Sequence, residues 1–318
     1  MKTSRAARQV LQGAAAVLVV GLVAYFFRNQ LVQNWSHLRD HELHFVPGFL
    51  AGSLASLVLS YLFLTAMWRH GANALCTGRP FTFMESVGMV NTTQLTKYIP
   101  GKIWGYAMQM ALVDRRSLSL SSVLYVNVLI ALTNSFLAVV IGGLYLSFSS
   151  HLLPFWLASL LTLAALLAYA FFLLFNGRFF ALFVKVLARV LGRRIEFFEL
   201  SPRALVWVQL LGLASAATCG LSAVLAGRGV GFDTSLALCW PVAAGFLLAD
   251  TIGFLAFFVP GGIGVREGVF YLVLAELGAS SLALVLPIAM RLVSMATDAL
   301  LGLIGFVTLR KYVKDGAA

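Results

Sequence analysis

Long apolar stretches separated by short polar connectors dominate this chain. Each stretch is long enough to cross the hydrocarbon core of a bilayer as an α-helix, which takes about 20 residues. The pattern predicts an all-α polytopic membrane protein with about seven spanning helices. The stretches cover residues 10–27, 46–68, 120–146, 154–175, 204–226, 235–259 and 282–309.

Two weaker helical stretches, 83–98 and 102–112, are too polar or too short to span a membrane alone. Pro100 and Gly101 lie between them and favour a turn. Both ends of this region are predicted on the same side of the membrane, so we expect a re-entrant or broken helical hairpin. A second hairpin is expected where 235–259 enters and 264–277 returns, inserted from the opposite side.

The tips of these two hairpins have similar sequences. The stretch "YIPGKIWGY" (98–106) aligns with "FVPGGIGVR" (258–266) at aromatic, β-branched, Pro, Gly and Ile positions. Each tip follows one spanning segment and precedes another, which predicts an inverted repeat of residues 46–146 and 204–309 within a single transmembrane domain, 1–318. Inverted repeats with broken helices are typical of secondary transporters.

Composition supports a membrane location and gives the orientation. Hydrophobic residues make up 60% of the chain and charged residues 11%, while Lys and Arg outnumber Asp and Glu by 23 to 12. In a membrane protein, an excess of basic residues indicates which loops are cytoplasmic and does not indicate nucleic-acid binding. The basic segments are the N-terminus, 69–116, 178–203 and 310–314, so we expect both termini in the cytoplasm and a bacterial inner-membrane location.

The N-terminal apolar segment is interpreted as a retained helix, since no small-residue cleavage site follows it. The three cysteines show no CxxC spacing and predict neither a disulfide framework nor a zinc site. Residues 176–203 predict a basic amphipathic connector, and the helix at 178–194 is expected to lie flat on the membrane as an anchor or, alternatively, as a substrate gate.

Unpaired backbone is tolerated at membrane depth only when it is buried in protein or faces a watery cavity. If glycines of the second tip open a short helix, their amides suit an anion. The alternative is a plain turn with charges that reach the interface. The predicted substrate-binding residues are Lys97, Pro100, Gly101, Lys102, Pro260, Gly261, Gly262, Gly264, Arg266, Glu267 and Arg291.

Ionisable residues inside apolar segments are costly and therefore functional candidates. Arg291 and Asp298 lie two turns apart on one face of the last helix. Together with Asp250 and Glu267 they could form ion pairs, or provide a protonatable site for coupling. Glu267 is expected to position the guanidinium of the adjacent Arg266.

Two polar clusters leave alternatives open. Residues 91–94 (Asn-Thr-Thr-Gln) suit either a wetted groove or hydrogen bonds between helices. His37, His41 and His44 could lie on one helix face and bind a metal, but no other ligand pattern supports this, so we expect solvated histidines and no metal. No cofactor motif is found.

The stretch "FVPGGIGVREG" (258–268), followed by "VFYLVLAELGAS", resembles the lysylphosphatidylglycerol synthase/flippase transmembrane-region family. "KYIPGKIW" and "LVDRRSLSLSSVL" also resemble the first half of that family. The family residues carried over are Pro260, Gly261, Gly262, Gly264, Arg266 and Glu267. Lys102 and Trp104 stand where the later motif has glycines. The resemblance implies translocation of a lipid between leaflets, and the soluble aminoacyl-transferase domain of some members is expected to be absent.

The sequence thus predicts a lipid translocase, not an enzyme. Its substrate would be an anionic, aminoacylated or polyprenyl-phosphate-linked lipid held in a cationic groove. The alternatives are a membrane-embedded transferase acting on a lipid-linked sugar and a scaffold for cell-envelope glycan enzymes. Homo-oligomers or envelope-biosynthesis enzymes are possible partners, and nucleic acid is not.

Overall fold

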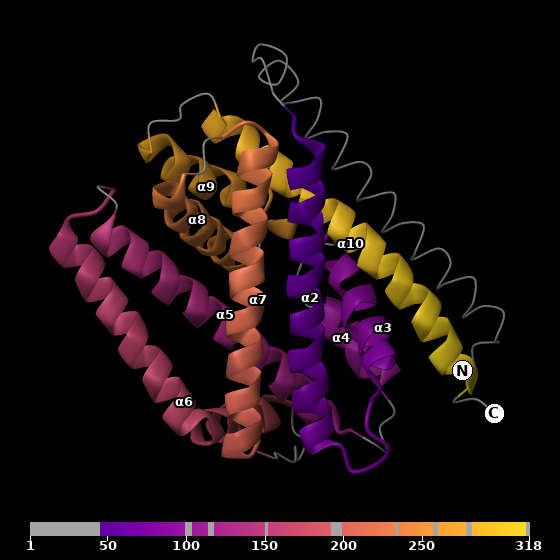
Figure 1. Cartoon of the computed structure of the whole chain (residues 1–318). Helices are drawn as coiled ribbons and strands as arrows, with labels where there is room; N and C mark the ends of the chain where they lie inside the picture. Colours follow the sequence, from indigo (N-terminus) through magenta and orange to yellow (C-terminus); the bar gives the residue numbers. More distant parts are fainter. Residues whose placement is uncertain are drawn as a thin grey trace.

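The computed structural model describes residues 45–98, 104–113, 118–149, 152–191, 199–232, 235–256, 260–277 and 282–315. Within these ranges all regular structure is helical, in the order shown in Figure 1. The elements are α2 (Pro47–Leu75), α3 (Phe83–Gln94), η1 (Leu95–Tyr98), α4 (Trp104–Leu112), α5 (Leu120–Phe148), α6 (Phe155–Leu191), α7 (Pro202–Gly229), α8 (Leu236–Leu255), η2 (Pro260–Gly262), α9 (Val265–Glu276) and α10 (Leu282–Asp315).

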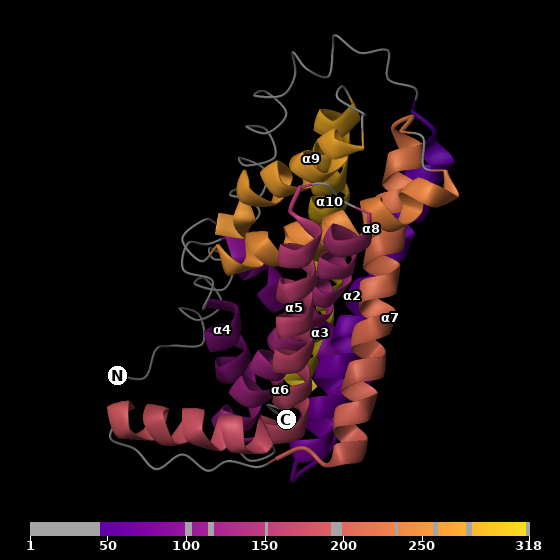
Figure 2. The same cartoon turned by 90° about the vertical axis from the view of Figure 1, so that its left-hand side faces the viewer.

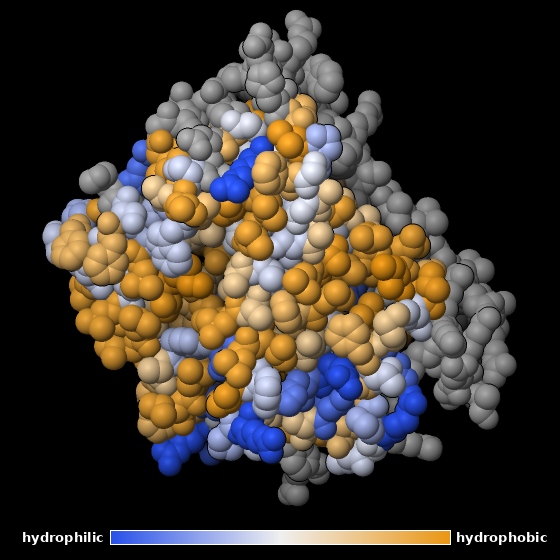
Figure 3. Space-filling view, in the orientation of Figure 1, coloured by the Kyte–Doolittle hydropathy of each residue, from blue (hydrophilic) through white to orange (hydrophobic). Residues whose placement is uncertain are grey.

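Six of these helices are long and apolar enough to cross a membrane, which confirms a multi-pass membrane protein. They are Pro47–Leu75, Leu120–Phe148, Phe155–Arg178, Pro202–Gly229, Leu236–Leu255 and Val285–Leu309. The predicted segment 10–27 and the three histidines at 37, 41 and 44 lie outside the described residues. Apolar side chains cover the middle of the visible face, and hydrophilic ones gather at its lower end (Figure 3).

The helix starts carry local signals that the sequence supplies. Pro47 and Pro202 occupy first turns, where a missing N–H leaves no hydrogen bond unmade. Thr82 accepts a hydrogen bond from the Glu85 N–H at 3.3 Å, and Glu85 accepts one from the Thr82 N–H at 2.7 Å. This capping box sets the beginning of α3.

Helices α2 and α7 pack along each other and lie side by side in both views, with α7 at the right-hand edge in Figure 2 (Figures 1 and 2). Small hydroxyl residues join them. The Ser53 and Ser222 hydroxyls are 3.0 Å apart, and those of Ser60 and Ser215 are also 3.0 Å apart. Because the earlier serine of α2 meets the later one of α7, the two helices run antiparallel.

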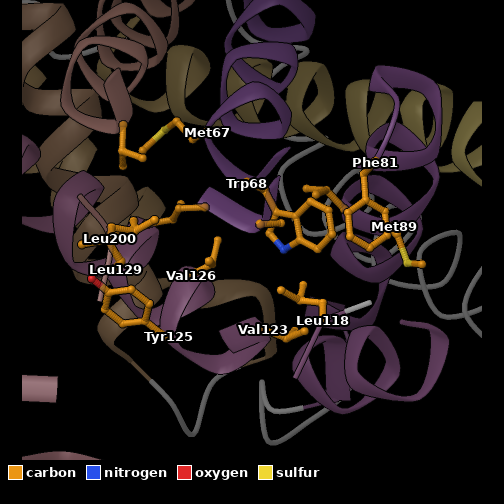
Figure 4. Packing of buried hydrophobic residues seen from close by; sticks show 14 of the residues in the cluster. Met67, Trp68, Phe81, Met89, Leu118, Val123, Tyr125, Val126, Leu129 and Leu200 are labelled. Carbon is orange, nitrogen blue, oxygen red and sulfur yellow. The ribbon is translucent and has the colours of Figure 1, made fainter. Parts of the chain in front are cut away.

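Two main clusters of buried apolar side chains flank this pair. The first joins α2, α3, α5 and α6 and includes Trp68, Phe81 and Leu129 (Figure 4). The Trp68 and Phe81 rings meet edge to face at 5.5 Å between centroids. The second joins α7 to α10 and includes Phe246 and Phe270.

The predicted flat segment begins inside a longer helix. Phe175 has non-helical backbone angles (φ −119°, ψ 18°), and the chain continues beyond it to Leu191 as part of α6. In Figure 2 this last part runs across the foot of the long helices. Lys185 and Arg189 are exposed there, as an amphipathic surface helix requires.

Candidate functional site

A cavity of about 280 Å³ opens where η1 approaches η2. One side is formed by α3, α4 and α5, and the other by α8, α9 and α10. Five of the ionisable residues singled out in the sequence line it: Lys97, Asp250, Arg266, Arg291 and Asp298. Residues far apart in the chain therefore meet in one chamber.

On the η1 side, Lys97 forms an ion pair with Asp298 of α10, with Nζ 2.7 Å from Oδ2. The Tyr98 hydroxyl donates to the same carboxylate oxygen at 2.6 Å. The Asp298 side chain has no exposed surface, whereas that of Lys97 is 30% exposed. Tyr61 of α2 lies 3.3 Å from the Lys97 ammonium through its hydroxyl. The ammonium therefore faces the cavity while its partner is enclosed.

Arg266 at the start of α9 makes contacts with two neighbouring helices. Its Nη1 is 2.9 Å from the Asp250 carboxylate of α8, and its Nη2 donates to the Ser294 hydroxyl of α10 at 3.2 Å. The guanidinium also lies over the Phe246 ring at 4.6 Å from the centroid. Half of the Asp250 side chain is exposed.

Arg291 is the most deeply buried of the three cations, with 4% exposure. Its Nη1 donates to the Gly261 carbonyl at 3.0 Å and lies 3.5 Å from the Glu267 carboxylate. Its Nε and Nη2 are buried and have no hydrogen-bond partner among the described residues. The Tyr98 ring, 5.9 Å from the guanidinium, covers it. Arg291 thus joins α10 to the second tip and retains unused donors.

Glycine is required at the second tip for two different reasons. Gly261, Gly262 and Gly264 have φ of 59°, 67° and 81°, in the left-handed region that favours glycine. A Cβ on Gly262 would also meet the Gly253 carbonyl oxygen at 2.7 Å, since the tip packs against the last turn of α8. Gly253 in turn leaves room for the Cβ of Arg266.

The structure corrects the prediction of a cationic groove. Among the described residues, each cation around the cavity has a carboxylate partner, in the pairs Lys97–Asp298, Arg266–Asp250 and Arg291–Glu267. These six side chains therefore carry no net charge. Ion pairing, one of the two roles expected for the buried carboxylates, is what the structure shows.

The prediction that Glu267 positions the guanidinium of Arg266 was also wrong. Glu267 pairs with Arg291 and not with the adjacent Arg266, because consecutive helical residues do not face each other. Its other oxygen accepts the Gly264 N–H at 2.6 Å. The start of α9 is therefore capped by the protein's own carboxylate, and Gly264 is not an open amide site for an anion.

The remaining predicted residues are distributed as follows. Gly261 lines the cavity, whereas Gly262, Gly264 and Glu267 do not line it. Pro260 begins η2. Pro100, Gly101 and Lys102 lie outside the described residues. Within the described ranges no group of His, Cys, Asp and Glu is suited to a metal ion.

The polar stretch at 91–94 serves both purposes considered for it. Asn91 donates to the Thr65 hydroxyl of α2 at 3.1 Å, between helices. Thr93 and Gln94 line the cavity. Gln109 of α4 donates to Thr93 at 3.0 Å and accepts from Asn127 of α5 at 2.6 Å.

Several residues that line the cavity were not predicted from the sequence. They are Tyr61, Tyr98, Gln109, Asn127, Asn134, Ser135, Gly253 and Ser294. Asn127 and Asn134 could have been predicted from the sequence, because they are polar residues within an apolar span. They lie two turns apart, the same spacing as that of Arg291 and Asp298. The others have no such signal in the sequence.

The chain matches the family described as "Lysylphosphatidylglycerol synthase TM region" over residues 12–302. This protein belongs to that family. The match covers both hairpin tips and every charged residue of the cavity. Membership indicates a lipid-related function in the membrane. Neither a curated protein nor a solved structure matches the chain.

Proposed function

We propose that this member of the lysylphosphatidylglycerol synthase transmembrane-region family is a lipid translocase. Its substrate would be an anionic, aminoacylated or polyprenyl-phosphate-linked lipid. The observation that carries the proposal is the charged cavity at the junction of η1 and η2, surrounded by helices long enough to span the bilayer. Ionisable residues at such depth are typical of transport pathways. The lipid tails would stay in the bilayer while the headgroup crosses this cavity.

We infer that α2–α5 and α7–α10 are the two halves of an inverted repeat. Each half consists of a long helix, a shorter pair of helices joined at a 3₁₀ tip, and another long helix. The first helices of the halves, α2 and α7, are antiparallel. Packing is also exchanged between halves: α3 contacts α10, and α8 contacts α5. Such symmetry supports alternating exposure of a central site.

The two tips would then belong to hairpins that enter from opposite faces. In Figure 1, α3 and α4 occupy the lower part of the molecule, and α8 and α9 the upper part. The two tips touch each other. Lys97 connects the first tip to Asp298 of α10. Arg291 of α10 contacts Gly261 of the second tip and Glu267 of α9.

Transport suits this cavity better than catalysis. A general base needs a carboxylate that is free to take a proton, whereas Asp250, Glu267 and Asp298 are all engaged by cations. Ion pairs that can be exchanged suit transient binding of a phosphate, because the substrate can replace a carboxylate on Lys97 or Arg266.

Leaflet-resolved lipid movement in proteoliposomes tests this function. Labelled phosphatidylglycerol, an aminoacylated derivative and a polyprenyl phosphate would be offered, and the wild-type protein is expected to accelerate transfer of at least one. Arg266→Gln should lower that rate about tenfold, the effect of losing about 1.4 kcal/mol of binding. Arg203→Gln, an exposed change outside the cavity, serves as the matched control. No acceleration for any of the three lipids would refute a translocase.

A further inference from the structure

One face of α5 carries amide and hydroxyl groups into the cavity. Asn127, Ile130, Ala131, Asn134 and Ser135 all line it. Asn134 lies at the middle of the spanning helix Leu120–Phe148. Polar side chains at this depth are costly unless they find a partner in the protein or in a ligand.

These polar groups differ in how they are satisfied. Asn127 is held in place, donating to Gln109 at 2.6 Å and to the Val123 carbonyl at 2.8 Å. Asn134, Ser135 and Gln94 are partly buried in the cavity wall, and within the described residues their side chains form no hydrogen bond with one another or with other groups. Three polar side chains are therefore available to a ligand.

The wall formed by α10 carries charged side chains, whereas that of α5 carries neutral polar ones, and the spacing along the two helices is the same. On α10, Arg291 and Asp298 are separated by two turns, as Asn127 and Asn134 are on α5. The α10 side, with Arg266 and with the Lys97 ammonium that reaches Asp298 from η1, is ionic. The α5 side is neutral but able to donate and accept hydrogen bonds. A molecule that fits both walls has a charged end and an uncharged hydrogen-bonding end.

We propose that Gln94, Asn134 and Ser135 form a subsite for the hydroxyl groups of the lipid headgroup, while its phosphate faces Lys97 and Arg266. This inference rests on the proposed lipid-translocase function and specifies the substrate class: a phosphodiester lipid bearing a polyol or a sugar. Amides both donate and accept, as hydroxyls do. A trimethylammonium group has no N–H or O–H to donate, and a headgroup that consists of phosphate alone has no polyol hydroxyls for these side chains to bind.

The size of the cavity agrees with this class. Its 280 Å³ lies just below the range of about 300–1,000 Å³ typical of sites for drug-sized ligands. The chamber therefore suits a glycerol phosphate or a single sugar phosphate with the hydrocarbon chains outside.

Binding of matched short-chain lipids to the purified protein in detergent tests the subsite. Dihexanoyl-phosphatidylglycerol would be compared with dihexanoyl-phosphatidic acid, and a farnesyl-phosphate-linked hexose with farnesyl phosphate. In at least one pair, we expect the hydroxyl-bearing probe to bind about tenfold more tightly, as one or two net hydrogen bonds allow. The pair that shows the preference identifies a phospholipid or an isoprenoid substrate.

Asn134→Leu should abolish this preference, bringing the ratio within the responding pair close to one without weakening the phosphate-only probe. Gln94→Ala is the second variant, so that misfolding of one variant does not decide the matter. Ser147→Ala on the same helix removes a hydroxyl outside the cavity and should leave the ratio unchanged. The subsite is ruled out if wild-type protein binds both members of each pair equally, or if both cavity variants keep the preference.

Failure of the subsite and failure of transport give different results. A wild-type protein that moves lipid in proteoliposomes but shows no preference for hydroxyl-bearing probes is a translocase without this subsite. A protein that keeps the preference in detergent and moves no lipid has the subsite without the proposed transport.

Discussion

Single residues around the cavity act through their partners more than through their own charge. Asp298 is enclosed and Lys97 is its only cationic partner in the described part of the chain within ion-pair distance. A buried carboxylate without a cation is strongly unfavourable, whereas loss of both charges is much less so. The ion pair is therefore expected to contribute to stability, in addition to the binding proposed for Lys97.

This dependence predicts a non-additive pair of substitutions. Lys97→Met should lower the free energy of unfolding by about 3 kcal/mol, because Asp298 stays buried and charged. The double variant Lys97→Met/Asp298→Asn should recover most of this loss. Thermal unfolding in detergent measures both, and additive losses would show that the two side chains are not coupled.

The glycines of the second tip predict unequal costs for the same substitution. Gly264→Ala meets no atom within 4 Å, so only its left-handed backbone is penalised, by about 1–2 kcal/mol. Gly262→Ala has the same penalty and also brings its Cβ to 2.7 Å from the Gly253 carbonyl oxygen. Gly262→Ala should therefore lower the unfolding temperature clearly more than Gly264→Ala. Equal effects would mean that the tip is not pressed against α8.

The sequence pointed to Arg291 and Asp298, which line the cavity, but not to the partner of Glu267. Arg291 and Asp298 can be recognised from the sequence, because a charged residue within an apolar stretch is unusual by itself. The pairing of Glu267 with Arg291 depends on how α9 packs against α10, which no local pattern contains. The balance of charge among the six described side chains depends on such contacts and was missed for that reason.

At the scale of whole helices, serine hydroxyls form hydrogen bonds along the α2–α7 contact. Ring contacts add to it: His70 with Trp207, and Arg228 over the Phe49 ring. Association in lipid depends on close packing and on such hydrogen bonds, because hydrocarbon gives no hydrophobic driving force between helices. The small side chains let the two long helices approach closely.

A double-mutant cycle on this contact should show modest coupling. Ser53→Ala and Ser222→Ala are expected to interact by about 0.6–1.7 kcal/mol, the range of hydrogen bonds between transmembrane helices. Ser235→Ala, at an exposed position whose side chain makes no capping bond, should change stability little. Zero coupling between the two buried serines would place the stability of the pair in van der Waals packing alone.

The length of the apolar stretches predicted most helix starts to within two residues, whereas the end of α2 lies seven residues beyond the predicted 68. The short helices α3 and α4 fall within the stretches expected from their polar and Pro-Gly limits. The apolar stretch 154–175 was predicted to end at the residue where α6 kinks, Phe175, two residues before Gly177. What was not predicted is that the helix continues through this kink to Leu191. The flat part of α6 was recognised instead from its basic amphipathic pattern.

For the molecule as a whole, the described basic surface of α6 and the start of α8 are expected on opposite sides of the membrane. With the native cysteines replaced, Lys185→Cys should react with an impermeant maleimide only after the cell is opened, and Leu236→Cys in intact cells. The expectation follows from the positive-inside rule. Labelling of both positions from one side would contradict the predicted orientation.

The three matched ion pairs also bear on energetics across a polarised membrane. A charge that crosses the membrane potential gains or loses about 2.3 kcal/mol per 100 mV. The six paired side chains sum to zero, so pairs that move together in the proposed translocase carry no net charge through the field. A dependence of the transport rate on the membrane potential would then report the charge of the transported lipid headgroup.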